Sequence, residues 1–127
     1  MRKKRILVDM SATIIHHGHI KLLKKAKKLG YVLVALTSDE HILKSKGFKT
    51  PFNFRQRKKV LDSIIYVDEV IKSPWLITNE FLKKNQIDFL VHGNDNKNKV
   101  KKSKLKIYKK TKGISSTLLR KSLSKSI

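Results

Sequence analysis

The chain has 127 residues, contains no cysteine and carries a formal net charge of +22. A chain of this length forms one domain, which we expect over residues 1–127, and without cysteine it forms neither a disulfide framework nor a thiolate metal site. The apolar runs are too short to span a bilayer, and the basic N-terminus lacks the long apolar stretch of a signal peptide. We therefore expect a cytoplasmic protein with no membrane span.

The hydrophobic periodicity and the capping residues predict ten elements along the chain. Gly30 closes one predicted helix, Ser38 and Asn53 begin two others, and either Thr78 or Asn79 begins a fourth. In chain order the elements are a strand (4–9), a helix (18–29), a strand (31–37), a helix (38–43), a helix (53–65), a strand (67–71), a helix (78–84), a strand (87–91), a strand (105–108) and a helix (115–123). Two longer polar segments, 44–52 and 93–103, are predicted to be loops.

Strands alternate with helices from end to end, which favours an α/β fold with a parallel sheet of about five strands and helices on both faces. Ligands of such sheets bind beyond the carboxyl ends of the strands. The loops that follow strands should therefore gather at one edge of the sheet, and these loops are 9–19, 37–46, 92–95 and 109–117.

The stretch His16-His17-Gly18-His19 lies between the first predicted strand and the first predicted helix. A helix N-terminus offers unpaired backbone N–H groups and a positive dipole end, and Gly18 lets a phosphate approach the backbone closely. His16 and His19 therefore indicate a phosphate-binding device. The alternative is that the histidines only cap a helix.

A second run of donors, Ser115-Ser116-Thr117, begins the last predicted helix and would meet phosphate oxygens in the same way. The alternative is an ordinary capping box without a ligand. Arg120, one turn further on, would reach a phosphate or would lie on the surface.

The positive charge comes from 26 lysines and five arginines, and the lysines are spread over nearly every segment. We interpret the charge mostly as a surface property that recruits polyanionic nucleotides and permits non-specific nucleic-acid binding. An alternative function, based on charge alone, is a nucleic-acid-binding module in which the histidines are structural.

The motifs together resemble the small cytidylyltransferases of the HxGH nucleotidyltransferase superfamily, above all the glycerol-3-phosphate and phosphoethanolamine enzymes. The resemblance runs from about residue 5 to residue 120. It is carried by the HHGH stretch, by Tyr-Val-Asp-Glu-Val at 66–70, by Val-His-Gly-Asn-Asp at 91–95 and by Ile-Ser-Ser-Thr-Leu-Leu-Arg at 114–120.

The resemblance implies a Rossmann-like fold and a cytidylyl transfer, in which an oxygen of a phosphorylated or phosphonate acceptor attacks the α-phosphorus of CTP and pyrophosphate leaves. It implies four catalytic side chains: His16, His19, Lys46 and Arg57. Lys46 would bridge the acceptor phosphate and the α-phosphate. Trp75 would wall the acceptor pocket, and the alternative is that it packs in the core. Asp95 would hold the cytosine amino group or an ammonium group on the acceptor, and the alternative is a polar turn.

The remaining nucleotide-binding and phosphate-binding positions are Ser11, Ala12, Gly18, Lys44, His92, Gly93, Lys110, Gly113, Ile114, Ser115, Ser116, Thr117 and Arg120. Mg²⁺ is expected to enter with CTP, held by phosphates and water rather than by a metal cage of the protein. The resemblance also implies a homodimer and a place in the synthesis of phospholipid or cell-envelope head groups. Candidate acceptors are phosphoethanolamine, 2-aminoethylphosphonate, phosphocholine and glycerol 3-phosphate, and the VHGND stretch favours an acceptor with an amino group.

The chain departs from the family pattern at two places. Met10-Ser11-Ala12-Thr13 stands where many members have Gly-Thr-Phe-Asp, while Lys110 and Lys112 replace an arginine and a glutamate. These changes affect the expected details of nucleotide binding. Because HxGH and ISSTxxR also occur in adenylyltransferases of cofactor synthesis, ATP is the alternative nucleotide.

Overall fold

A computed structural model describes residues 3–93, 104–108, 119 and 121–123 of the chain. Helices and strands alternate through most of it, as the periodicity predicts. In chain order the elements are β1 (Arg5–Met10), α1 (His17–Leu29), β2 (Tyr31–Leu36), α2 (Asp39–Lys46), α3 (Phe54–Asp62), β3 (Glu69–Lys72), α4 (Asn79–Lys84), β4 (Phe89–Gly93) and β5 (Leu105–Tyr108). No helix in the described ranges is long and apolar enough to cross a membrane.

The five strands form one parallel sheet in the order β3-β2-β1-β4-β5. This arrangement confirms the predicted α/β, Rossmann-like fold. The chain runs outward from β1 to β2 and β3 and then crosses back to β4, so the strand order reverses between β1 and β4. The crevice at the carboxyl ends of these two strands is where open α/β sheets bind their ligands.

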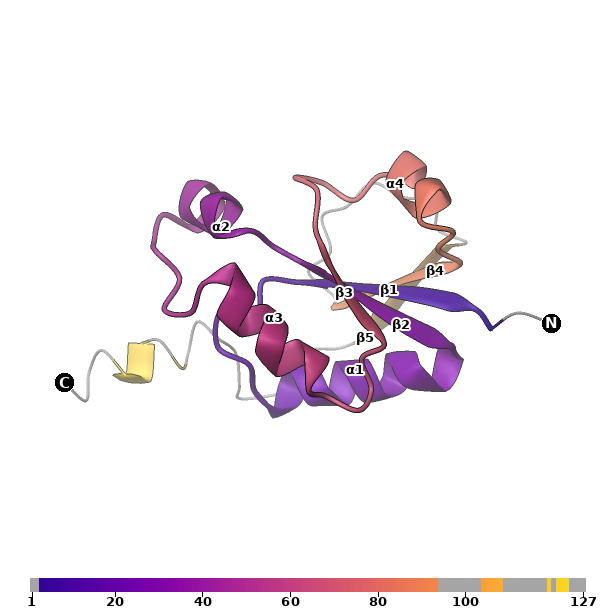
Figure 1. The fold of residues 1–127 in the computed structure, drawn as a ribbon, viewed down its shortest axis with the longest axis horizontal. Coiled ribbons are helices and arrows are strands. Elements are labelled where there is room, and N and C mark those ends of the chain that lie inside the picture. Colours follow the sequence, from indigo (N-terminus) through magenta and orange to yellow (C-terminus); the bar gives the residue numbers. More distant parts are fainter. Residues whose placement is uncertain (1–2, 94–103, 109–118, 120, 124–127) are drawn as a thin grey trace.

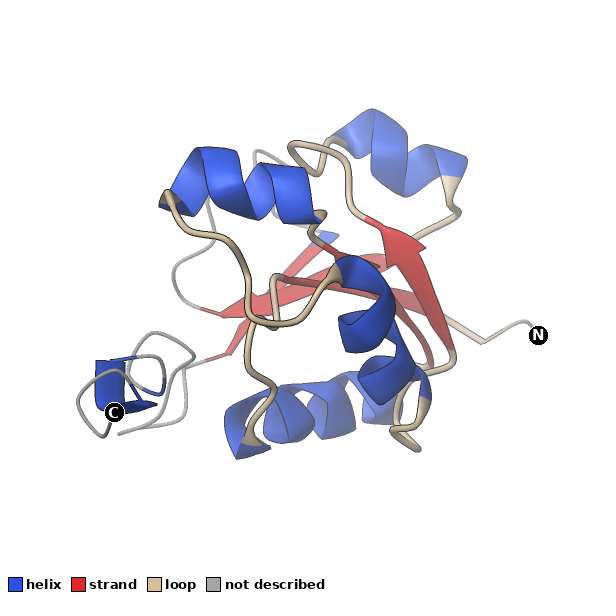
Figure 2. Cartoon of the chain, turned by 60° about the vertical axis from the view of Figure 1, so that its left-hand side comes forward, coloured by secondary structure: helices blue, strands red, loops and turns tan. Residues whose placement is uncertain are grey.

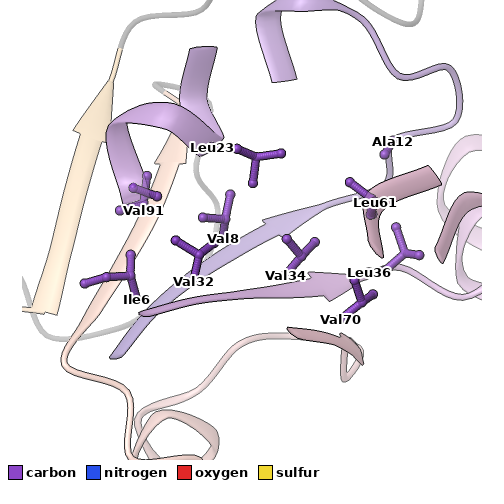
Figure 3. Packing of buried hydrophobic residues seen from close by; sticks show 11 residues of the cluster. Ile6, Val8, Ala12, Leu23, Val32, Val34, Leu36, Leu61, Val70 and Val91 are labelled. Carbon is purple, nitrogen blue, oxygen red and sulfur yellow. The ribbon is translucent and has the colours of Figure 1, made fainter. Parts of the chain in front are cut away.

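Helices cover both faces of the sheet (Figures 1 and 2). On one face, side chains of α1 and α3 such as Leu23 and Leu61 pack on Ile6, Val8 and Val34 of the central strands (Figure 3). On the other face, a second cluster buries α4 against the opposite sides of the same strands. Because the central strands are buried on both faces, β1 and β2 appear in the sequence as continuous apolar runs.

Gly30 joins α1 to β2 at a point where the chain leaves no room for a side chain. A Cβ atom at this position would lie 2.1 Å from the carbonyl oxygen of Lys4, at the start of β1. The next residue, Tyr31, donates its N–H to the same carbonyl oxygen at 2.8 Å. Gly30, the predicted cap of α1, therefore also allows the end of α1 to lie directly against the backbone of Lys4, just before β1.

Several predicted element boundaries were wrong. β4 runs from Phe89 to Gly93, two residues later at both ends than the predicted strand. α2 continues to Lys46, three residues beyond the predicted end, and stops at Gly47, whose left-handed backbone (φ 73°) lets its N–H bond to the carbonyl oxygen of Leu43 at 3.0 Å. α3 ends at Asp62, three residues early. β3 begins at Glu69, two residues later than predicted. The preceding residue, Asp68, donates its backbone N–H to the carbonyl oxygen of Val32 in β2, and its carboxylate accepts the N–H of Val32.

Figure 1 shows α2 at the same end of the sheet as the loops that follow β1 and β2. The prediction that these loops gather at one edge is confirmed for the described segments.

Candidate active site

The side chains of His16 and His19 cap the N-terminus of α1 by accepting hydrogen bonds from backbone N–H groups of the first turn. His16 is the N-cap residue in extended conformation, and its Nδ1 accepts the N–H of Gly18 at 3.0 Å. In return, Nδ1 of His19 accepts the N–H of His16 at 3.1 Å. A capping box of this kind is ordinarily built from a serine or threonine with a glutamate or glutamine three residues later. Here two imidazoles form it, with ring centroids 4.1 Å apart.

The capping bonds determine which ring nitrogen carries the proton. A neutral imidazole has one acceptor nitrogen and one N–H donor, so a ring whose Nδ1 accepts a backbone N–H holds its proton on Nε2. Burial and the charge of His17 lower the pKa of His16. Burial, followed by the charges of His16 and Lys46, lowers the pKa of His19 to about 4. At pH 7 the pair therefore presents two uncharged Nε2–H donors at a helix N-terminus.

Lys46 lies near these histidines. It occupies the last turn of α2, where its side chain is exposed, and its charge lowers the pKa of His19 and, after burial, that of His41. Lys46 is thus close enough to His19 for its charge to act on that ring. Lys44, two residues earlier, is likewise exposed on α2. Both lysines belong to a helix, whereas the sequence predicted a basic loop.

Arg57, the fourth predicted catalytic residue, has a different environment. Its side chain is 1% exposed, and its guanidinium donates four hydrogen bonds to protein oxygens. Contact of Arg57 with a phosphate stays a prediction that this arrangement does not support.

Asp9 and His92 meet across the switch point of the sheet. Val8 of β1 and Val91 of β4 are register partners, and the next residues on each strand pair through Oδ1 of Asp9 and Nδ1 of His92. Both side chains are partly exposed, at 16% and 18%. His92 was predicted as a phosphate-binding residue, whereas Asp9 was missed. The sequence feature that could have identified Asp9 is a single carboxylate near the end of an apolar strand.

The loop after β1 carries the predicted nucleotide-binding residues Ser11 and Ala12, and the side chain of Ala12 is buried. Ala12 has a left-handed backbone (φ 47°) and buries its methyl group in the cluster of α1 and α3, which leaves it 3% exposed. Its side chain therefore packs in the core rather than lining a ligand site. Ser11 lies before it and pairs its hydroxyl with that of Thr37 at 3.5 Å, while Thr13 is buried.

Trp75 follows β3 and is 56% exposed. Its ring stacks on His41 of α2, with centroids 3.8 Å apart and planes at 15°. The predicted wall of the acceptor pocket is thus held against α2, the helix that carries Lys46. The stacking partner His41 was not identified from the sequence.

The rest of the predicted phosphate site lies largely outside the described residues. Gly18 is in the first turn of α1 and Gly93 ends β4. The positions outside the described ranges are Asp95, Lys110, Gly113, Ile114, Ser115, Ser116, Thr117 and Arg120. Among the described residues, no group of three histidine, aspartate or glutamate side chains is arranged to hold a metal ion.

Comparisons with known proteins identify the family of this chain. The family model described as Cytidylyltransferase-like matches residues 11–122. Ethanolamine-phosphate cytidylyltransferase of Mus musculus is 39% identical over 93 residues, which cover 72% of this chain and 23% of the mouse protein. Glycerol-3-phosphate cytidylyltransferase of Staphylococcus aureus is 37% identical over 126 residues, which cover 94% of this chain and 95% of that protein.

A solved structure supports the fold alone. The lipopolysaccharide core biosynthesis protein from Thermoplasma volcanium superposes with a TM-score of 0.65 at 21% identity, covering 97% of this chain and 88% of its own.

The family match extends over most of the sequence, and it includes the two histidines that the structure joins at the start of α1. The chain belongs to the cytidylyltransferase-like family.

Proposed function

We propose that this protein transfers CMP from CTP to a small phosphorylated or phosphonate acceptor and releases pyrophosphate. The observation that carries the proposal is the pair of neutral Nε2–H donors that the histidine capping box creates. The positive charge of Lys46 acts on the same site through His19. The relatives named above, including a Staphylococcus aureus enzyme of nearly the same length, support CTP as the nucleotide.

In the proposed reaction an oxygen of the acceptor phosphate forms a bond to the α-phosphorus of CTP. The bond from that phosphorus to the bridging oxygen of pyrophosphate breaks, and the electron pair leaves with pyrophosphate. No proton has to be removed from an ionised acceptor oxygen. The protein therefore contributes by orienting the two phosphates and by donating to oxygens whose charge changes in the transition state. His16, His19 and Lys46 are suited to that role, because they remain donors throughout.

Within the acceptor class we propose a molecule with an amino group, such as phosphoethanolamine or 2-aminoethylphosphonate. Asp9 supports this choice, because it places a carboxylate at the carboxyl ends of β1 and β4, where ligands of this fold bind. Glycerol 3-phosphate is the alternative, which the Staphylococcus aureus relative favours.

We propose that Mg²⁺ accompanies CTP. The histidine and lysine side chains at the site offer N–H groups, which suit phosphate oxygens and not a hard cation, and the carboxylate of Asp9 is paired with His92. The ion would therefore be held by phosphate oxygens and water, and it would neutralise part of the triphosphate charge.

A homodimer, a cytoplasmic location and non-specific nucleic-acid binding complete the proposal. The lack of cysteine fits a reducing compartment, and the net charge of +22 favours polyanions. Light scattering would give the oligomeric state. Nucleic-acid binding of this kind should weaken steeply as salt rises, whereas stabilisation by CTP should persist at moderate salt.

A pyrophosphate-release assay tests the reaction directly. CTP and ATP are each offered with phosphoethanolamine, 2-aminoethylphosphonate, phosphocholine and glycerol 3-phosphate. We expect release with CTP and an amino-bearing acceptor, and a preference for that acceptor over glycerol 3-phosphate that Asp9→Asn reduces. Release with ATP alone would establish adenylyl transfer instead. No release from CTP with any of the four acceptors would refute the proposal.

A further inference from the structure

Arg57 is a fully buried charged side chain close to the candidate active site. It lies in the first half of α3, it is 1% exposed, and it is the largest of the fully buried side chains among the described residues. A buried guanidinium is strongly unfavourable unless its N–H groups are bonded and its charge is paired. Its partners therefore indicate what it does.

Four protein oxygens receive its hydrogen bonds. Nε donates to the carbonyl oxygen of Phe52 at 3.0 Å, and Nη1 donates to those of Ser11 at 2.7 Å and Thr37 at 2.8 Å. Nη2 donates to Oδ1 of Asp39 at 2.6 Å, which also compensates the charge. A guanidinium has five N–H groups, so four acceptors use nearly all of its capacity.

The acceptors belong to the segments that carry the candidate catalytic residues. Ser11 lies in the loop that leads from β1 to His16. Thr37 directly follows β2, Asp39 is the first residue of α2, and Phe52 lies in the segment between α2 and α3. One side chain thus fixes the loop before the histidine capping box to the beginning of the helix whose last turn carries Lys46.

The loop after β1 requires such support. Ala12 directly follows the carbonyl group that Arg57 binds, and its positive φ of 47° is unfavourable for a residue with a Cβ atom. A conformation of this kind persists only where the surroundings determine it, and it is often found where a site needs a fixed geometry. The hydrogen bond to Ser11 and the burial of the Ala12 methyl group supply that constraint.

We propose that Arg57 is a positioning residue, which sets the distance between the histidine pair and Lys46 and does not itself contact a phosphate. The proposal rests on the proposed function. Rate enhancement by oriented donors is sensitive to displacements of about 1 Å, which change rates by about 100-fold. Loss of the four-way contact should therefore impair turnover more than nucleotide binding.

Arg57→Lys is the test variant, because lysine keeps the charge but lacks the planar fork that reaches four acceptors. Arg55→Lys, an exposed position two residues earlier on α3, is the matched control. Leu82→Ala, in the other hydrophobic cluster, controls for loss of stability alone. We expect Arg57→Lys to lower kcat for CTP and phosphoethanolamine by about 10-fold to 100-fold, with the KM for CTP changed less than about threefold.

Hydrogen exchange of the ligand-free protein gives a second readout. In Arg57→Lys the amides of residues 11–13 and 37–41 should exchange faster, while those of β4 and α4 stay unchanged. An increase of tenfold or more in the KM for CTP, with kcat and exchange unchanged, would make Arg57 a direct phosphate ligand and overturn the proposal.

Two further outcomes would overturn the positioning role: normal kcat in Arg57→Lys, or an equal loss of kcat in Leu82→Ala at a matched fall in melting temperature. Wild-type protein that releases no pyrophosphate would instead refute the proposed function. A failed function and a failed positioning role are thus distinguished.

Discussion

Lowering the pH from 7 to 4 should destabilise this protein through His19. The pKa of His19 is about 4 in the folded chain, against an ordinary value of 6.5 in the unfolded chain. Between these values the unfolded state binds a proton that the folded state excludes, because burial and then the charges of His16 and Lys46 disfavour the protonated ring. A protonated Nδ1 would also no longer accept the N–H of His16. The contribution of His19 is therefore fully present above pH 6.5 and is lost as the pH falls toward 4.

The size of this loss follows from the pKa shift. Each pKa unit corresponds to 1.36 kcal/mol, so His19 alone should remove up to about 3 kcal/mol of folding free energy between pH 7 and pH 4. Other groups also titrate in this range, and a variant that keeps the cap without titrating separates them. His19→Gln is suitable, because glutamine is an ordinary capping-box residue at this position. His17→Gln, at an exposed position of the same turn, is the matched control.

Urea unfolding followed by circular dichroism at pH 7, 6, 5 and 4 measures the effect. Wild type and His17→Gln should lose about 2–3 kcal/mol more than His19→Gln over this range. Equal losses in wild type and His19→Gln would refute the conclusion that the folded chain lowers the pKa of His19 and keeps its ring neutral. The assignment of Nε2–H as an uncharged phosphate donor would then lose its basis.

Three other substitutions test the role of Lys46 and two structural features of the fold. Lys46→Ala should lower turnover with the acceptor by about 10-fold to 100-fold in the pyrophosphate assay, because a cation near the phosphates is lost, whereas Lys59→Ala on the far part of α3 should not. Gly30→Ala should lower stability in urea unfolding by about 2 kcal/mol or more, because its Cβ would meet the Lys4 carbonyl oxygen at 2.1 Å; a melting temperature unchanged from wild type would contradict that close approach. Ser38→Ala should cost about 1 kcal/mol in thermal unfolding through loss of the α2 N-cap, and Ser38→Asn should restore it.

The fold was predictable because local and long-range signals agree in this chain. Apolar runs mark β1 and β2, and Ser38, Asn53 and Thr78 are each the N-cap residue of the helix that the sequence predicted there. The end of α2 was not predictable in the same way. Its last turn, Lys44 to Lys46, has no apolar periodicity, and the stop depends on a glycine that serves equally well in a loop.

The candidate site was predictable only where it lies in one segment. The histidine motif follows from a short stretch of sequence, whereas Lys46 was expected in a loop and lies in the last turn of α2. The pairing of Asp9 with His92 depends on the register of β1 against β4, which joins residues 83 positions apart. The role of Arg57 depends on three loops that meet around one guanidinium, and the sequence shows only an arginine on a helix.

Under the proposed function the histidine pair performs two tasks, capping α1 and donating to phosphate, that other residues could perform separately. A serine and a glutamine would cap α1 as well as His16 and His19, and they would not lose their bonds as the pH falls. Histidine in both positions therefore lowers stability in mild acid without improving the cap. What histidine adds is an N–H donor on the far side of the ring, fixed in direction because Nδ1 is bound to the backbone. The double variant His16→Ser, His19→Gln separates the tasks: it should fold with a normal α1, resist acid better than wild type, and lose about 10²-fold or more in turnover.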